Sequence, residues 1–286
     1  MESLSFRIVL RKGEAGRGLP RLAPRFRVAG VTFDFWETLF MDTPALDRLR
    51  DELRCKGLQE NLAKLGVEVS FEDLALGLRE STPWLANIWK KGEQVSTLEQ
   101  IRYIVNHATK NQPILLTDPE VLMRLEESYW SPSLTAPATL NADAPKVLQR
   151  LSERGLKIGL ICNTGRGPGH ALRELMRREG VLDYFDATIF SDEVGYGKPD
   201  TRIFLTAAKM LGLQPSYVLH VGDNIENDVG GAQSAGMKTL LFDYEVPSGF
   251  REQPSLLALT RASDSSTSVK PDGRIKSLSE ILNFIH

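Results

Sequence analysis

Four groups of polar residues follow short apolar segments of the sequence, and they hold the side chains that chemistry would need. The groups are Asp34 with Thr38; Asn163, Thr164, Gly165 and Arg166; Lys198; and Asp223 with Asp228. The apolar segments are rich in β-branched or aromatic residues, which predicts buried strands. Because the carboxyl ends of parallel strands meet at one edge of a sheet, we expect the four groups to converge there.

Three of these side chains are carboxylates, and their convergence has an electrostatic consequence. Asp34, Asp223 and Asp228 would repel one another strongly in one crevice unless a cation lay between them. Hard oxygen ligands with open positions for water and phosphate suit Mg²⁺. Lys198 adds a positive charge that can keep Asp34 ionised and pair with a phosphate oxygen. The sequence therefore predicts a Mg²⁺ site beside Asp34.

The remaining members of the four groups are donors that suit an anion. Thr38 and the turn 163–165 offer hydroxyl and backbone N–H groups. A carboxylate, a lysine and Mg²⁺ around an anion pocket are the equipment for phosphoryl transfer through an aspartyl-phosphate. Singly, each residue has a plainer interpretation, with Asp34 as a turn cap, Lys198 as a solvated loop lysine and Arg166 as a surface charge. The prediction depends on the four groups together.

Two sequence patterns divide the chain and position these groups. From residue 146, short apolar segments alternate with helical ones, which predicts a parallel sheet covered by helices. The segment 28–35 has no partner strand nearby in sequence, so we expect it to join this later sheet. Residues 43–137 carry leucines at helical spacing and capping signals such as Ser96-Thr97-Leu98-Glu99. We therefore predict an α/β core of residues 28–42 and 138–286, with helical residues 43–137 inserted after its first strand.

The helical insertion offers few clear candidates for chemistry. Its cations Arg79, Lys90 and Arg102 would suit a substrate anion, but the sequence does not orient their helices. Its tryptophans are interpreted as core, and Pro83 is expected to end one helix before a second begins. In the α/β part, His220 lies on a predicted strand and is also interpreted as core.

The composition is that of a globular chain with a net charge close to zero. Of its 286 residues, 42% are hydrophobic and 25% charged, and the formal net charge is −2. This gives no argument for nucleic acid or a membrane as a partner, and no apolar run approaches the roughly 20 residues of a membrane span. Two cysteines are too few for a disulfide framework, so a reducing, cytoplasmic setting is expected.

Two segments differ from the rest of the chain. Residues 1–27 are rich in arginine and interrupted by Gly and Pro, which indicates a basic, poorly ordered extension. An organellar transit peptide is the alternative interpretation of this segment. Residues 247–273 are rich in Ser and Pro and are predicted to form a long loop.

The order of the four groups resembles the motifs of the haloacid dehalogenase-like (HAD) hydrolase superfamily. The resemblance covers residues 28–242 and is most specific in Gly197-Lys198-Pro199-Asp200 and in residues 222–228. It implies a Rossmann-like three-layer α/β core with a parallel sheet, over which the inserted helices form a cap. It also implies an enzyme, a hydrolase of the phosphatase type.

The resemblance assigns roles to individual residues. Asp34 would be the nucleophile, and Lys198 would stabilise Asp34 and the transferring phosphoryl group. Mg²⁺ would be held by Asp34, Asp223, Asp228 and the backbone carbonyl of Trp36. Thr38 would support catalysis, and the phosphate would be bound by Asn163, Thr164, Gly165 and Arg166.

Two positions depart from the pattern of the superfamily. Cys162 stands where Ser or Thr is usual, and backbone donors of Asn163 and Thr164 would have to take over that role. Trp36 stands where phosphatases typically carry a second Asp that protonates the leaving oxygen. Indole cannot transfer a proton at neutral pH, and general acid–base help is worth roughly 10²–10⁴ in rate.

The substitution by Trp36 leaves three interpretations open. The enzyme acts on small phosphorylated metabolites with good leaving groups, or Glu37 supplies the proton, or the chain binds a phosphate ligand without much catalysis. A dehalogenase-type C–X hydrolase is a fourth, because dehalogenases of the superfamily also carry an aromatic residue at this position. The leading prediction is a Mg²⁺-dependent phosphatase, monomeric or homodimeric.

Overall fold

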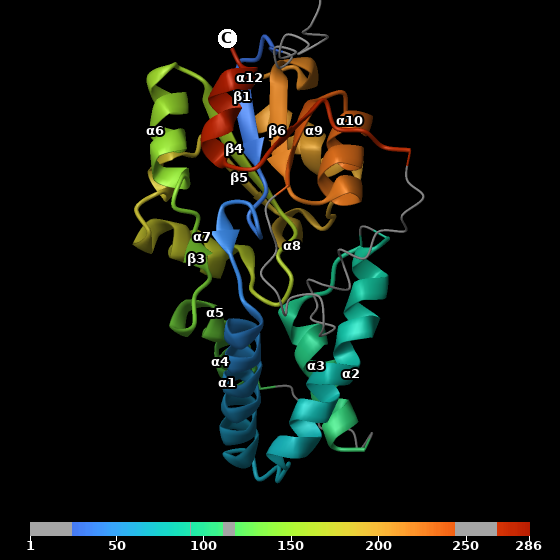
Figure 1. The fold of residues 1–286 in the computed structure, drawn as a ribbon. Coiled ribbons are helices and arrows are strands. Elements are labelled where there is room, and N and C mark those ends of the chain that lie inside the picture. The colour runs from blue at the N-terminus through green and yellow to red at the C-terminus, as the bar shows by residue number, and fades with distance from the viewer. Residues whose placement is uncertain (1–24, 92, 111–117, 244–267) are drawn as a thin grey trace, which may run out of the picture.

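A computed structural model describes residues 25–91, 93–110, 118–243 and 268–286, and Figure 1 shows its fold. A six-stranded sheet forms its centre, and all neighbouring strands in it are parallel. In spatial order the strands are β5 (Ala187–Phe190), β4 (Lys157–Cys162), β1 (Gly30–Phe33), β6 (Val218–Gly222), β7 (Lys238–Phe242) and β8 (Gly273–Ile275). The first strand of the chain thus joins the later sheet, as predicted, and it lies between β4 and β6.

Helices cover both faces of the sheet and make three layers. One face packs against α6 (Ala144–Glu153), α7 (Gly169–Arg178) and α12 (Ile281–Phe284), and the other against α9 (Thr201–Met210) and α10 (Gly231–Ser234). Side chains alternate between the two faces, because successive residues of a strand point to opposite sides. The predicted α/β class with a Rossmann-like parallel sheet is confirmed.

A helical unit lies beyond the C-terminal ends of the strands (Figure 1). It contains α1 (Pro44–Ala63), α2 (Phe71–Trp89), α3 (Thr97–Ala108), α4 (Pro119–Trp130) and α5 (Pro132–Thr135). Helices α1 to α4 share a hydrophobic cluster separate from those of the sheet. The chain passes from the core to the helical unit and back through two segments. These segments pair as two short antiparallel strands, β2 (Phe40–Met41) and β3 (Thr139–Leu140). The division into domains at residues 43 and 137 stays a prediction.

The sequence signals for helix ends are right for the start of α3 and wrong for the end of α2. Ser96 caps α3 in a full capping box with Glu99. The predicted break at Pro83 is wrong, because α2 continues through it to Trp89. A proline inside a helix costs about 3 kcal/mol, but Leu78 and Leu85 on either side of it are buried, and their packing offsets that cost.

The first described residues meet the C-terminal segment. Phe26 pairs with Ile285, and its N–H donates to the carbonyl of Phe284. Residues 1–24 of the predicted basic extension and residues 247–267 of the predicted loop lie outside the described residues. Within the residues described, no helix has the length and apolar character to cross a membrane.

Candidate active site

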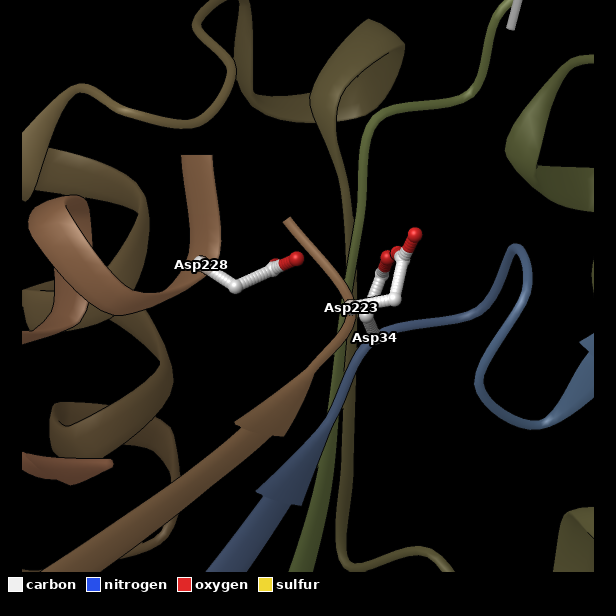
Figure 2. Close-up of side chains that lie close together, drawn as sticks. All are labelled: Asp34, Asp223 and Asp228. Carbon is white, nitrogen blue, oxygen red and sulfur yellow. The ribbon is translucent and has the colours of Figure 1, made fainter. Parts of the chain in front are cut away.

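The ends of two neighbouring strands place the first two carboxylates side by side. Asp34 follows β1 and Asp223 follows β6, which pairs with β1 in parallel. The Asp34 N–H donates to the carbonyl of Val221 at 2.9 Å, which extends the sheet ladder up to the carboxylate. The N–H of Phe35 donates to Asp34 Oδ1 at 2.7 Å and fixes the side chain. Figure 2 shows both carboxylates at this edge, with Asp228 directed toward them from the next turn.

Lys198 connects two of the three carboxylates. Its ammonium lies 2.6 Å from Asp34 Oδ1 and 2.6 Å from Asp228 Oδ1, and all three side chains are buried. Burial lowers the pKa of a lysine, but here the carboxylates of Asp228 and Asp34 outweigh burial and raise the pKa of Lys198. Asn163 fixes the lysine loop, because its side chain accepts from the Lys198 N–H at 2.7 Å and donates to the Lys198 carbonyl at 2.9 Å.

The carboxylates have unequal environments. Burial raises the pKa of Asp34 to about 6, against the opposing charge of Lys198. Burial, and then the charges of Asp228 and Asp34, raise the pKa of Asp223 well above its ordinary value. Burial acts on Asp228 in the same direction, but Lys198 and His220 outweigh it and hold its pKa far below the usual range. Two carboxylates thus have their ionised form disfavoured, which is the condition that a bound cation relieves.

The three carboxylates fit a divalent cation. One oxygen of each lies within 4.8 Å of one oxygen of the other two. An all-oxygen donor set of this kind suits Mg²⁺ better than a softer metal.

Asp228 is oriented by a turn with close backbone contact. It lies on the π-helical turn η3 (Ile225–Gly230), and its Oδ2 accepts from the Asn224 N–H at 2.9 Å. Gly222, the last residue of β6, leaves room for this carboxylate. A Cβ at position 222 would lie 2.3 Å from Asp228 Cγ, too close for any side chain.

We therefore expect Gly222→Ala to push Asp228 out of its place. Overpacking of this kind typically costs about 1–3 kcal/mol, and Mg²⁺ affinity should fall with it. Gly230→Ala is the matched control, since its Cβ would meet nothing closer than 3.5 Å. Thermal unfolding and Mg²⁺ titration calorimetry measure both effects, and equal behaviour of the two variants would contradict this account of Gly222.

A cavity of about 160 Å³ opens between the sheet edge and the helical unit. Its wall includes the carboxylates, Lys198, Asn163, Thr164, Gly165 and Arg166. Trp36, which is half-buried, and Trp89 from α2 also line this wall. Trp89 is buried, as expected of a core residue, and also lines the cavity. Of the three helical cations considered above, Lys90 lines the cavity, while Arg79 and Arg102 are exposed elsewhere.

The residues after β4 make contacts in two different places, the core and the helical unit. The Thr164 N–H donates to Ser191 Oγ at 3.1 Å, and the two hydroxyls lie 3.2 Å apart. Arg166 turns away from the carboxylates and enters the helical unit. Its guanidinium donates to the hydroxyl of Tyr129 at 2.7 Å and to Ser81 Oγ and Thr82 Oγ1, each at 3.0 Å. The contact of Arg166 with phosphate stays a prediction. To make it, the guanidinium would have to give up some of these hydrogen bonds to the helical unit.

The turn after Asp34 holds three residues that the sequence singled out. Thr38 is buried and does not line the cavity, and its Oγ1 has no hydrogen-bond partner among the described residues. Glu37 adopts a positive φ of 55° and is buried, and its Oε1 accepts from the Asp42 N–H at 3.2 Å. Glu37 is not among the residues that line the cavity. Trp36 alone of the three reaches the cavity wall.

Sequence reasoning missed several polar residues around the site. Arg50 and Arg54 of α1 are buried on the cavity wall, where Arg50 pairs with Asp42 and Arg54 pairs with Asp51. His220, interpreted as core, contacts Asp228. The i, i+4 spacing of the two arginines on a helix is the signal that would have placed them on one face.

The comparisons with known proteins agree with this fold. A family model described as haloacid dehalogenase-like hydrolase matches residues 28–236, and an HAD-hydrolase-like model matches residues 195–280. The chain therefore belongs to the haloacid dehalogenase-like hydrolases, and the predicted resemblance and hydrolase class are confirmed.

Several curated relatives are phosphatases by name, among them the following two. Ribulose-1,5-bisphosphate 5-phosphatase of Halopiger xanaduensis is 32% identical over 148 residues, which are 52% of this chain and 60% of that protein. Phosphoserine phosphatase of Thermus thermophilus is 34% identical over 125 residues, 44% of this chain and 48% of that protein. The matched parts thus span less than two thirds of these relatives.

Solved structures share the fold over nearly the whole chain. A 2-haloacid dehalogenase from Pseudomonas syringae superposes with a TM-score of 0.60 at 22% identity, covering 90% of this chain and 97% of that one. An HAD phosphatase from Thermococcus onnurineus gives a TM-score of 0.54, also at 22% identity, covering 88% and 95%. At this identity the likeness describes the fold alone.

Proposed function

We propose that this hydrolase is a Mg²⁺-dependent phosphatase that forms an aspartyl-phosphate on Asp34 and acts on small phosphorylated metabolites. The observation that carries the proposal is the position of the Lys198 ammonium, 2.6 Å from both Asp34 and Asp228 and beside Asp223 on one cavity wall. The phosphatase names of two relatives support it. A cytoplasmic monomer or homodimer is part of the same proposal.

The chain's own residues divide the reaction between them. Asp34 attacks phosphorus, the bond from phosphorus to the leaving oxygen breaks, and the leaving group departs with the electron pair. Lys198 balances the charge of Asp34 and of the phosphoryl oxygens. Water then cleaves the aspartyl-phosphate and frees phosphate. Mg²⁺, held by Asp34, Asp223, Asp228 and the Trp36 carbonyl, would neutralise charge on the transferring group.

The leaving group has no acid beside it in this scheme. Trp36 occupies the wall next to Asp34, and Glu37 is held in the turn by the Asp42 N–H. We infer that substrates whose leaving oxygen needs little protonation, such as acyl phosphates, are turned over faster than alkyl phosphates.

A panel of metabolite phosphates, with acetyl phosphate and an aryl phosphate included, tests the proposal in the presence of Mg²⁺ or EDTA. Phosphate release in Mg²⁺ that stops in EDTA is the expected result. Release that EDTA leaves unchanged would contradict the metal site. Chloride release from a 2-haloacid without metal would favour a dehalogenase. Stabilisation by Mg²⁺ with BeF₃⁻ in the absence of any turnover would favour a binding protein.

Replacing the indole tests the missing acid directly. We expect Trp36→Asp to raise turnover of an alkyl phosphate by about tenfold or more, as part of the roughly 10²–10⁴ that a well-placed general acid contributes, and that of acetyl phosphate much less. Trp36→Asn is the matched control, because it opens the same space without a proton donor. Equal rates for the two variants on both substrates would mean that protonation does not limit the native enzyme.

A further inference from the structure

A buried chain of hydrogen bonds leads from β1 through β6 to the site. Thr32 Oγ1 lies 3.0 Å from His220 Nδ1, and His220 Nε2 lies 3.1 Å from Asp228 Oδ1. Asp228 Oδ1 in turn lies 2.6 Å from the Lys198 ammonium, which contacts Asp34. These hydrogen bonds therefore begin at Thr32 on β1, two residues before Asp34, and lead back to Asp34.

The sheet register makes this chain possible. Thr32 and His220 are direct partners in the parallel pairing of β1 and β6, so their side chains lie on the same face. His220 is 1% exposed and meets the ring of Phe204 edge to face, at 5.1 Å between centroids. A histidine buried in this way commonly serves only the packing of the core. Here, however, one of its two nitrogens contacts a carboxylate of the site itself.

The partners of Asp228 fix where the protons lie. Its carboxylate also accepts from the Lys198 ammonium and from the Asn224 N–H, so it is ionised and can only accept. His220 Nε2 must therefore carry a proton and donate it to Asp228. A neutral imidazole then accepts at Nδ1, and the Thr32 hydroxyl donates to it. Asp228 thus selects the tautomer, and the Thr32 hydroxyl, which can donate or accept, completes the hydrogen bonding of the ring.

We propose that His220, which donates from Nε2 to Asp228 and is supported at Nδ1 by Thr32, is a positioning residue that orients Asp228 toward Lys198 and the metal site. The proposal builds on the proposed Mg²⁺ function. Partners that hold a ligating carboxylate or imidazole in place typically contribute about 10–100-fold to metal affinity or activity. Lys198 and the Asn224 N–H hold Asp228 as well, so His220 acts together with them.

Mg²⁺ titration calorimetry without substrate tests the proposal. We expect His220→Leu to weaken Mg²⁺ binding by about tenfold, and Thr32→Val, which leaves the imidazole in place, to weaken it less. His220→Gln keeps an amide donor and should restore part of the affinity. Val218→Ala is the matched control, because Val218 is buried on the same strand but its loss should lower only thermal stability.

The outcomes separate this proposal from the function on which it rests. If the wild type and Asp223→Asn both fail to bind Mg²⁺, the proposed function and the positioning role fail together. If the wild type binds and Asp223→Asn does not, but a folded His220→Leu binds like the wild type, only the positioning role is overturned.

Ring ¹⁵N chemical shifts test the tautomer independently of metal. The chain has four histidines, so the His220 signal can be assigned by substitution. A neutral ring protonated at Nε2 is expected in the wild type. A ring protonated at Nδ1 would overturn the proposal.

Discussion

Asp34→Asn is expected to reduce phosphate release by at least about 10³-fold, a loss of the size seen when a nucleophile is removed. An amide cannot attack phosphorus, and the change leaves the volume of the side chain almost unaltered. The fold should persist, because Lys198 keeps Asp228 as its partner. Burial already disfavours the Asp34 carboxylate, so its removal should cost little thermal stability.

Steady-state phosphate release from an aryl phosphate, with unfolding temperatures alongside, measures this expectation. Asp183→Asn is the matched control, since that carboxylate is exposed and lies outside the cavity. Turnover by Asp34→Asn within tenfold of the wild type would mean that another residue takes the phosphoryl group.

Lys198→Met is expected to lower both stability and activity. It leaves Asp34 and Asp228 buried and facing each other without the cation that lies 2.6 Å from each. Removal of one partner from a buried ion pair costs about 3–5 kcal/mol. Activity should fall at the same time, because the phosphoryl oxygens lose their fixed positive charge.

Denaturant unfolding without metal measures the change in the free energy of unfolding. The double variant Lys198→Met, Asp228→Asn should regain part of the loss, because one of the two unpaired carboxylates is then gone. A loss below about 1 kcal/mol in Lys198→Met would contradict a buried cation with two carboxylate partners. A double variant less stable than the single one would contradict the assigned repulsion.

The parallel sheet, and the convergence of the polar residues that follow its strands, could be predicted from the sequence. Short apolar strands that alternate with helices leave few arrangements other than a parallel sheet. In such a sheet the residues after the strands share one edge. The sequence alone therefore predicts the convergence of four side chains, Asp34, Lys198, Asp223 and Asp228. The structure brings these four to one cavity wall.

The contacts across the cavity could not be predicted, because they join segments far apart in sequence. Arg166 follows a strand of the core, but its partners Ser81, Thr82 and Tyr129 belong to helices whose faces the sequence did not orient. The role of His220 depends on the strand register, which local patterns do not give. Pro83 shows the same limit, because tertiary packing there overrides a local helix breaker.

The proposed aspartyl-phosphate can be measured directly. The enzyme is mixed with an activated phosphate in Mg²⁺, quenched in acid during turnover and digested for mass spectrometry of the peptide that contains Asp34. The account predicts an added phosphoryl group on Asp34, present in Mg²⁺, absent in EDTA and absent in Asp34→Asn. Sustained phosphate release with no phosphoryl group on Asp34, in a quench that preserves acyl phosphates, would contradict it.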